Sequence, residues 1–210
     1  MTNILKMKFD KKTHWDKVYE TKTSDQVSWT QLVPKTSLNF IKSFGCNKNT
    51  KIIDVGGGDS LLVDFLLEDG YTNITVLDIS SKAIEKAQNH LGVKAKEVNW
   101  IVSDIVSFKP ETSYDIWHDR ATFHFLREQL EINNYIELLK KYVKEYISIG
   151  VFSEKGPLKC SGLDIVQYSE QKLLIEIEDD FERLNSFTED HITPFETKQN
   201  FLFCSFKKIE

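Results

Sequence analysis

A short apolar strand that leads through three glycines into a helix is the feature that most constrains how this chain can fold. Residues 52–55 are mostly apolar, glycines occupy positions 56–58, and the apolar residues after Ser60 recur at helical spacing. We therefore expect the glycines to form a strand-to-helix turn. In an open α/β sheet, the turn after the first strand lies beside a nucleotide-like ligand, because glycine lets the backbone come close and a helix start offers free N–H groups.

The residues around this turn also restrict which ligand can lie there. A dinucleotide-binding turn has a third glycine where this chain has Leu61. Asp59 stands just before the expected helix, where a carboxylate competes with a phosphate for the helix dipole and the free N–H groups. The phosphate-loop pattern Gly-x-x-x-x-Gly-Lys-Ser/Thr does not occur in the sequence. We therefore expect a ligand with adenosine but no phosphate, of which S-adenosylmethionine (SAM) is the common example.

Acidic residues stand at the ends of three expected strands. Asp54 belongs to the strand before the glycines, Asp78 ends a strand over 74–78, and Asp104 follows a strand over 99–102. The carboxyl ends of parallel strands share one rim, so Asp78 can accept from both ribose hydroxyls and Asp104 from the adenine amino group. Each aspartate taken singly is equally explained as a helix N-cap, whereas three after successive strands favour ligand binding. The cofactor-binding residues predicted at this rim are Asp54, Gly56, Gly57, Gly58, Asp78, Ile79, Asp104 and Ile105.

The stretch around these acids resembles a known family. Over 54–60 and again over 67–83, the chain is similar to class I SAM-dependent methyltransferases, particularly to the branch that contains small protein-lysine methyltransferases. The resemblance covers most of the sequence and implies SAM as cofactor and S-adenosylhomocysteine (SAH) as product. Members of this family have an N-terminal lid over the methionine end of SAM, and this lid is resembled by the residues His14, Trp15, Tyr19 and Trp29 of this chain.

The chain departs from that branch after the fourth expected strand. Where the lysine-modifying members have Asp-Lys-Gly-Thr, this chain has Asp119-Arg120-Ala121-Thr122 preceded by His118, so the resemblance does not imply the acceptor. His118 is the first candidate for a base, because an imidazole suits proton removal near neutral pH. An equally good alternative is that His118 supplies only backbone contacts to the SAM amino group and that Asp119 pairs with Arg120. We predict His118, Asp119 and Arg120 as the catalytic residues.

Other polar and aromatic residues are expected near the same rim. His124, between two phenylalanines, is expected to be a core histidine. Lys159 lies in a glycine-rich loop and either holds an anionic acceptor or is solvated. His191 belongs to a hairpin tip that can reach over the pocket, although turn formation alone also explains its composition. Trp15 and Tyr19 share one helix face and suit core packing as well as a lid, so only the resemblance favours the lid.

The order of apolar and polar segments predicts an α/β fold: a Rossmann-like, doubly wound, seven-stranded sheet, mostly parallel with an antiparallel last strand. Pro34 and Gly45 begin and end a helix that precedes the sheet. The link between the last two strands is too short for the crossover that a parallel pair requires. We expect a long loop over 157–168. Strands are expected near 51–55, 74–78, 99–102, 114–117, 146–152, 181–188 and 199–206. Helices are expected near 13–19, 60–68, 80–91, 125–143 and 169–177.

Composition indicates one domain and disfavours several classes of partner. With 210 residues, 40% of them hydrophobic, we expect one domain over 1–210, with a lid segment over 1–33 and a core over 34–210. A net charge of −5 without a basic stripe argues against nucleic acid. Three widely spaced cysteines without a Cys-x-x-Cys pair predict free thiols in a reducing compartment and no metal site. Because no apolar run suits a leader or a membrane span, we expect a cytoplasmic protein without a membrane partner.

Three hypotheses about function follow. The first is a SAM-dependent methyltransferase acting on a small metabolite, in which alignment of the acceptor and exclusion of water supply most of the rate. The second is a protein-lysine N-methyltransferase, which needs an open groove and an acidic or aromatic channel for the amine. The third is a catalytically silent SAM-binding domain that serves as a partner subunit. The methyl acceptor itself is not specified by the sequence.

Overall fold

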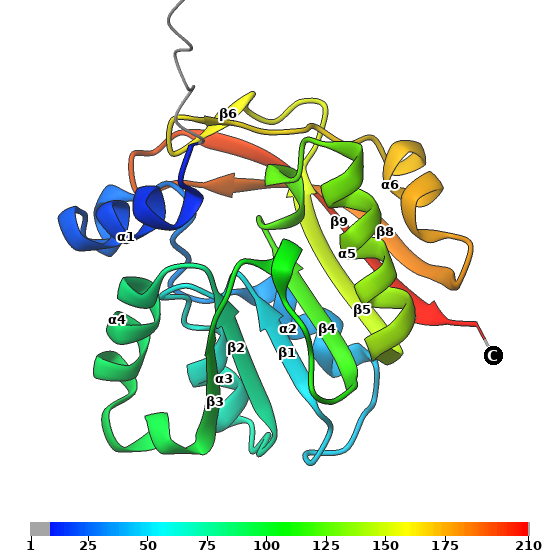
Figure 1. The fold of residues 1–210 in the computed structure, drawn as a ribbon, viewed down its shortest axis with the longest axis horizontal. Helices are drawn as coiled ribbons and strands as arrows, with labels where there is room; N and C mark the ends of the chain where they lie inside the picture. Colours follow the sequence, from blue (N-terminus) through cyan, green and yellow to red (C-terminus); the bar gives the residue numbers. More distant parts are fainter. Residues whose placement is uncertain (1–8, 210) are drawn as a thin grey trace, which may run out of the picture.

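The computed structural model describes residues 9–209, so residues 1–8 of the expected lid segment lie outside the described residues. Its main feature is a seven-stranded sheet in the order β3-β2-β1-β4-β5-β9-β8 (Figure 1). The five strands from β3 to β5 are parallel, and β9 is antiparallel to both β5 and β8. The predicted Rossmann-like sheet with an antiparallel last strand is confirmed. Its strands are β1 (Ile52–Val55), β2 (Ile74–Asp78), β3 (Val98–Val102), β4 (Tyr114–Arg120), β5 (Val143–Phe152), β8 (Phe181–Ile192) and β9 (Lys198–Lys208).

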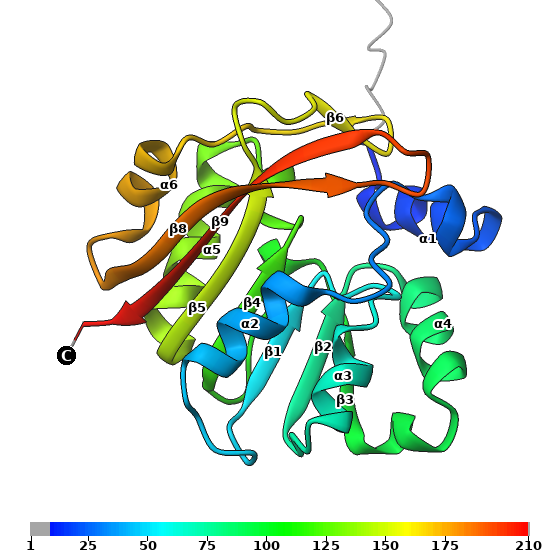
Figure 2. The ribbon, with the colours of Figure 1, turned by 180° about the vertical axis from the view of Figure 1, so that it is seen from behind.

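Helices cover both faces of this sheet (Figures 1 and 2). α2, α3 and α4 pack on one face, whereas α5 and α6 pack on the other. Within β1, Ile52 packs with the first group and Ile53 and Val55 with the second, because successive strand side chains point to opposite faces. The parallel strands are therefore buried on both sides. The helices are α1 (Lys11–Thr21), α2 (Lys35–Ser43), α3 (Leu62–Glu68), α4 (Ser81–Leu91), α5 (Gln129–Tyr142) and α6 (Glu170–Ile177).

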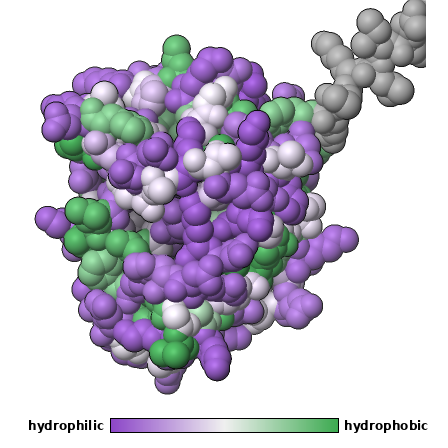
Figure 3. Space-filling model, turned by 90° about the vertical axis from the view of Figure 1, so that its left-hand side faces the viewer, coloured by the Kyte–Doolittle hydropathy of each residue, from purple (hydrophilic) through white to green (hydrophobic). Residues whose placement is uncertain are grey.

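The N-terminal segment lies across one end of the sheet. α1 begins at an N-cap, Asp10, whose side chain accepts a hydrogen bond from N of Thr13 at 3.2 Å, and it packs against α4. The surface on this side is mostly hydrophilic, with hydrophobic residues in small separate patches (Figure 3). Within residues 9–209, no helix combines the length and the apolar character that crossing a bilayer requires.

Several boundaries differ from those expected, and two of them affect the site. β4 continues to Arg120 because its last residues pair with β5 as far as Gly150, so positions 118–120 are strand and not loop. The turn that follows is the 3₁₀ helix η4 (Phe123–Phe125), and α5 begins only at Gln129. The expectation of a long loop over 157–168 is wrong in part. That segment contains a small hairpin formed by β6 (Lys159–Cys160) and β7 (Leu163–Asp164).

Candidate functional site

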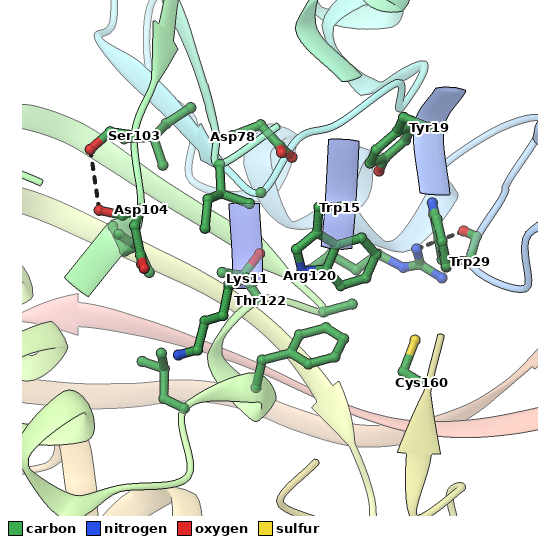
Figure 4. A pocket seen from close by; sticks show the side chains of 17 residues that line it. Lys11, Trp15, Tyr19, Trp29, Asp78, Ser103, Asp104, Arg120, Thr122 and Cys160 are labelled. Carbon is green, nitrogen blue, oxygen red and sulfur yellow. Dashed lines mark hydrogen bonds between the residues drawn. The ribbon is translucent and has the colours of Figure 1, made fainter. Parts of the chain in front are cut away.

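A cavity lies beyond the carboxyl ends of the central parallel strands, where residues of α1 form part of its wall (Figure 4). Asp78 and Asp104 lie on one side of it, and Arg120, Trp29 and Cys160 on the other. The predicted site residues that line the cavity are Trp15, Tyr19, Trp29, Gly56, Asp78, Ile79, Asp104, Ile105 and Arg120. The predicted site residues that do not line it are Asp54, Gly57, Gly58, His118 and Asp119.

The glycine turn is shaped by close contacts that side chains would prevent. Gly56 has φ 68° and Gly58 has φ 55°, the left-handed region that glycine adopts without strain. A Cβ atom on Gly56 would overlap Oγ1 of Thr122, and one on Gly57 would lie 2.7 Å from Oδ2 of Asp54. The turn therefore folds tightly over Asp54, which is why that carboxylate lies beneath the glycines and not in the cavity.

Asp78 is the buried acid that faces the cavity from the end of β2. It is 6% exposed, and its Oδ1 accepts a hydrogen bond from N of Ser80 at 2.7 Å. Burial raises the pKa of Asp78 to about 7, with smaller contributions from the carboxylates of Asp54 and Asp59. Hydroxyl donors stabilise the charged form of such a carboxylate, so a ligand with vicinal hydroxyls fits this position.

Asp104 occupies the corresponding place after β3. It begins the 3₁₀ helix η3 (Ile105–Ser107), where its Oδ1 accepts from N of Val106 at 3.0 Å. Asp104 therefore caps a helix and also lines the cavity, so the helix-cap explanation and the ligand-binding explanation do not exclude each other for this residue. Ile79 and Ile105 line the cavity beside the acids. An apolar wall next to a carboxylate suits a flat heterocycle that carries an amino group.

Aromatic side chains from the lid form the opposite wall. The ring centroid of Trp15 lies 5.6 Å from that of Trp29 and 5.3 Å from that of Phe125, both in edge-to-face arrangements. The hydroxyl of Tyr19 lies so close to the glycine turn that a Cβ atom on Gly58 would overlap it. Burial raises the pKa of Tyr19 well above its usual value. These aromatic side chains form one wall of the cavity.

Polar contacts hold α1 on the core. Oδ1 of Asp16 accepts a hydrogen bond from Oγ of Ser80, the N-cap residue of α4, at 2.8 Å. Nζ of Lys11 donates to Oε1 of Glu131 in α5 at 2.7 Å. The lid is therefore attached to helices on both faces of the sheet.

His118 lies in β4 and does not reach the cavity. Its Nδ1 is 2.7 Å from Oδ1 of Asp54, and its Nε2 is 2.8 Å from Oγ of Ser37. The residue is 3% exposed, and both ring nitrogens have partners. Because β4 continues past this position, the side chain lies between β1 and α2. The structure does not place the imidazole where it can take a proton from a ligand in the cavity.

Asp119 organises the turn after β4. Its Oδ2 accepts from the hydroxyl of Tyr135 at 2.7 Å, and its Oδ1 accepts from N of Thr122 at 2.9 Å and from N of Phe123 at 3.3 Å. Burial raises its pKa to about 6. The partners of Asp119 are thus Tyr135 and backbone amides, not Arg120 as one sequence hypothesis had it.

Arg120 ends β4 and lines the cavity. Its Nη1 donates to the carbonyl oxygen of Trp29 at 3.0 Å, and its Cζ lies 4.7 Å from the ring centroid of Phe201. Its Nε and Nη2 are buried and have no hydrogen-bond partner within residues 9–209. Burial lowers the pKa of Arg120 to about 10.

The remaining candidates from the sequence lie outside the cavity. His124 is fully buried, as the core prediction requires, and its Nδ1 accepts from N of Phe152 at 3.2 Å, but its Nε2 has no partner within residues 9–209. Burial lowers its pKa to about 3. Lys159 is exposed and forms an ion pair with Asp164 at 3.0 Å. His191 is bonded to the lid, because its Nε2 lies 2.7 Å from the carbonyl oxygen of Ser28.

Several lining residues have no signal in the sequence. Ala121 has φ 73°, a conformation that nothing in its residue type predicts, and it turns Thr122 back toward the glycines. Cys160 reaches the cavity only because β6 folds over it. Phe125 could have been found as an aromatic residue shortly after the fourth strand. The lining residues that were not named individually as site residues are Lys11, Leu77, Ser103, Ala121, Thr122, Phe125, Leu126 and Cys160, although the segment over 117–126 and the loop over 153–162 were expected at the rim.

The residues that line the cavity fit SAM. Carboxylates face the end of the cavity where the hydroxyls of ribose and the amino group of adenine would lie, and aromatic rings line the other end. The positive charge of Lys11 is already paired with Glu131, so it does not oppose a cationic ligand. Gly56 of the glycine turn also lines the cavity. In the described part of the chain, no group of three or more His, Cys, Asp or Glu side chains is placed to hold a metal ion.

Comparison with known proteins gives one family match and several distant relatives. Residues 52–144 match a family model described as a methyltransferase domain. Malonyl-acyl-carrier-protein O-methyltransferase 1 of Ilyobacter polytropus is 31% identical over 99 residues, 47% of this chain and 37% of the relative. Human EEF1A lysine methyltransferase 2 is 23% identical over 184 residues, 81% of this chain and 74% of the relative. The match with the first of these relatives thus spans little more than a third of its length.

Solved structures agree on the fold. The N-methyltransferase NodS of Bradyrhizobium japonicum, in complex with SAH, has a TM-score of 0.71 at 14% identity, covering 93% of this chain and 98% of that one. At such low identity the likeness shows the fold alone. Residues 52–144 of this chain thus match a methyltransferase domain, and the chain shares its fold with SAM-dependent methyltransferases of known structure.

Proposed function

We propose that this protein is an enzyme that binds SAM in the cavity and transfers its methyl group to a small-molecule acceptor. The observation that carries the proposal is Asp78, a buried carboxylate at the end of β2 that faces the cavity beside a glycine turn. A carboxylate in this place is suited to the ribose hydroxyls of SAM. The family match over residues 52–144 supports the same cofactor.

The lining residues have distinct roles in this proposal. Asp78 holds the ribose, and Asp104, with Ile79 and Ile105, holds the adenine. Trp15, Tyr19 and Trp29 cover the methionine end and exclude water, which favours the reaction of a charged sulfonium. Gly56 lets the backbone come close to the cofactor, whereas Gly57 and Gly58 shape the turn.

When bound, SAM would supply an electrophilic methyl carbon: the acceptor's lone pair would form the new bond, the carbon–sulfur electrons would go to sulfur, SAH would leave and the acceptor's proton would pass to solvent. The chain contributes alignment of the two molecules within about 3–3.5 Å. His118 and Asp119 contribute by positioning. His118 joins β1, β4 and α2 through Asp54 and Ser37, and Asp119 fixes the turn that carries Thr122.

Two alternatives are kept, each for a stated reason. The human lysine methyltransferase aligns over 81% of this chain, which favours protein-lysine N-methylation as the second candidate. Against it stands the cavity itself, which a lid of three aromatic residues covers. A catalytically silent SAM-binding partner subunit would share the cofactor site and differ only in turnover. The free thiols of Cys46, Cys160 and Cys204 support our proposal of a reducing compartment such as the cytoplasm.

The test is to incubate the purified protein with a cell extract and methyl-tritiated SAM. We expect the label to enter molecules that pass a filter that retains proteins. Label in retained protein, released as methyl-lysine on hydrolysis, would favour the second candidate. Binding of SAM without label transfer to any fraction would favour the silent subunit. A matched sample of the Asp78→Asn variant controls for methyltransferases already present in the extract.

A further inference from the structure

The cavity contains a cation whose charge no neighbouring carboxylate neutralises. Nη1 of Arg120 donates to the carbonyl oxygen of Trp29 at 3.0 Å, while the buried Nε and Nη2 have no partner within the described range of the chain. Lys11, which also lines the cavity, is already paired with Glu131 at 2.7 Å. Two unsatisfied donors on a buried guanidinium are costly unless a ligand supplies an acceptor.

The carboxylates that act on the pKa of Arg120 are bonded elsewhere. Glu189 and Asp54 favour its charged form from a distance. Glu189, however, accepts a hydrogen bond from Oγ1 of Thr36, and Asp54 is bonded to the imidazole of His118. Burial outweighs both acids and lowers the pKa of Arg120 to about 10, so the guanidinium stays charged at neutral pH without full compensation.

The guanidinium also lies away from the acids expected to hold adenosine. Asp78 and Asp104 are on one side of the cavity, and Arg120 is on the other beside Trp29 (Figure 4). Its Cζ packs 4.7 Å from the ring centroid of Phe201 in β9, a strand that does not border the glycine turn. A group that reaches Arg120 therefore comes from the part of the cavity left for the acceptor.

We propose that Arg120 binds a carboxylate of the methyl acceptor, an inference that rests on the proposed function. The planar fork of an arginine binds a carboxylate through two parallel hydrogen bonds, and Arg120 has two free donors. One carboxylate balances one guanidinium. The aromatic rings of Trp15, Trp29 and Phe125 offer the rest of the acceptor an apolar surface. An acceptor with a free ammonium group, such as a lysine side chain, would instead be repelled by Arg120.

A carboxylate in this cavity can come from two sources, the acceptor or the methionine end of the cofactor. The first arm of the experiment separates them by titrating SAH and 5′-methylthioadenosine, which lacks the amino acid end, into the wild type and the Arg120→Met variant. We expect the affinity for each ligand to change by less than about threefold. A large loss of SAH affinity with unchanged 5′-methylthioadenosine affinity would assign Arg120 to the cofactor and overturn the proposal.

The second arm uses benzoate as the probe and benzamide as its neutral counterpart, with the unfolding midpoint of SAH-saturated protein as the readout. We expect benzoate at about ten times its Kd to raise the midpoint by on the order of 3 °C, and benzamide to have little effect. Arg120→Met should abolish the benzoate effect. Arg120→Lys, which keeps a donor for Trp29 but loses the fork, should reduce it. Lys159→Met, which removes an exposed positive charge outside the cavity, should leave it intact.

The outcomes distinguish an error in the proposed function from an error in the assignment of Arg120 to a carboxylate. Failure of the wild type to bind SAH in the first arm would overturn the proposed function itself. If SAH binds but benzoate does not stabilise the wild type, or stabilises Arg120→Met equally, the carboxylate assignment is wrong and the cofactor assignment stands. Should Arg120→Met fail to fold, an unchanged benzoate effect in Arg120→Lys, compared with the wild type, would overturn the assignment by itself.

Discussion

At the scale of single residues, burial decides what each polar group at the rim can do. Asp54, Asp78 and His118 have side chains of similar polarity and lie within a few strand positions of one another. Only Asp78 faces the cavity. The other two are bonded to each other at 2.7 Å beneath the glycine turn. The same residue type thus faces the cavity at Asp78 and supports the glycine turn at Asp54.

Replacement of Asp78 by asparagine should weaken cofactor binding. An amide cannot accept from two ribose hydroxyls as a carboxylate does, so we expect SAH to bind Asp78→Asn on the order of 1–3 kcal/mol more weakly. Calorimetric titration measures the change. An unchanged Kd would remove Asp78 from the cofactor site.

The raised pKa of Asp78 also predicts a pH dependence. Because that pKa is about 7 and ribose hydroxyls bind the charged carboxylate, SAH affinity should rise by up to about tenfold from about pH 6 to about pH 8. The stability of the ligand-free protein should change in the opposite sense. The folded pKa exceeds the unfolded value of 3.8, so the folded state binds more protons and loses stability as pH rises toward 7. In Asp78→Asn, both SAH affinity and the stability of the ligand-free protein should depend less on pH.

Gly56 allows a separate test of close packing. Gly56 and Gly45 have nearly equal φ values of 68° and 67°, but a Cβ atom on Gly56 would overlap Oγ1 of Thr122, whereas one on Gly45 has open space. Backbone strain is therefore common to Gly56→Ala and Gly45→Ala. We expect Gly56→Ala to lose about 1–3 kcal/mol more unfolding free energy in urea, because Thr122 must give up its bond to the carbonyl oxygen of Val55. Equal losses would show that Thr122 adjusts freely.

At the scale of elements, the site is assembled by segments that pack across the carboxyl ends of the strands. α1 is joined to α4 through Asp16 and to α5 through Lys11. η4 brings Phe125 against Trp15 at 5.3 Å. The small hairpin of β6 and β7 adds Cys160. Each of these segments closes one side of a cavity whose base is the sheet.

Loss of the contact between α1 and α4 should therefore loosen the lid. Asp16→Ala removes the acceptor for Oγ of Ser80, and we expect SAH to bind on the order of 1 kcal/mol more weakly. The intrinsic fluorescence of Trp15 and Trp29, which lie in the lid, should change as well. Lys12→Ala is the matched control, because Lys12 pairs with Asp16 at an exposed position and such pairs contribute little. A similar effect of both substitutions would contradict a specific role of the Ser80 contact.

At the scale of the whole molecule, we propose that the lid and the core form one cooperative domain. Trp29 packs against a core cluster that contains residues of α2, β5 and β9. Two further clusters occupy the two faces of the sheet. The described lid is therefore joined to the core through Trp29, Asp16 and Lys11.

Urea unfolding should accordingly give one transition for all probes. Trp15 and Trp29 report on the lid and Trp100 and Trp117 on the sheet, so we expect Trp→Phe variants that isolate each pair to share one midpoint with far-UV circular dichroism. A lower midpoint for the lid tryptophans would divide the chain into two unfolding units. SAH should raise the single midpoint in proportion to its occupancy.

The sequence by itself determined the alternation of strands and helices, the direction of β9 and the place of Asp78 and Asp104 at the rim, because these depend on local periodicity, loop length and strand order. It did not determine which polar side chains face the cavity. The pairing of β4 with β5 continues through Arg120, and this turns His118 into the core and leaves two donors of Arg120 without a partner among residues 9–209. Such orientations depend on strand register and on segments distant in the chain, including the hairpin of Cys160 and the helix of Ser37. Only the tertiary structure decides them, because hydrogen bonding and burial are properties of neighbours in space.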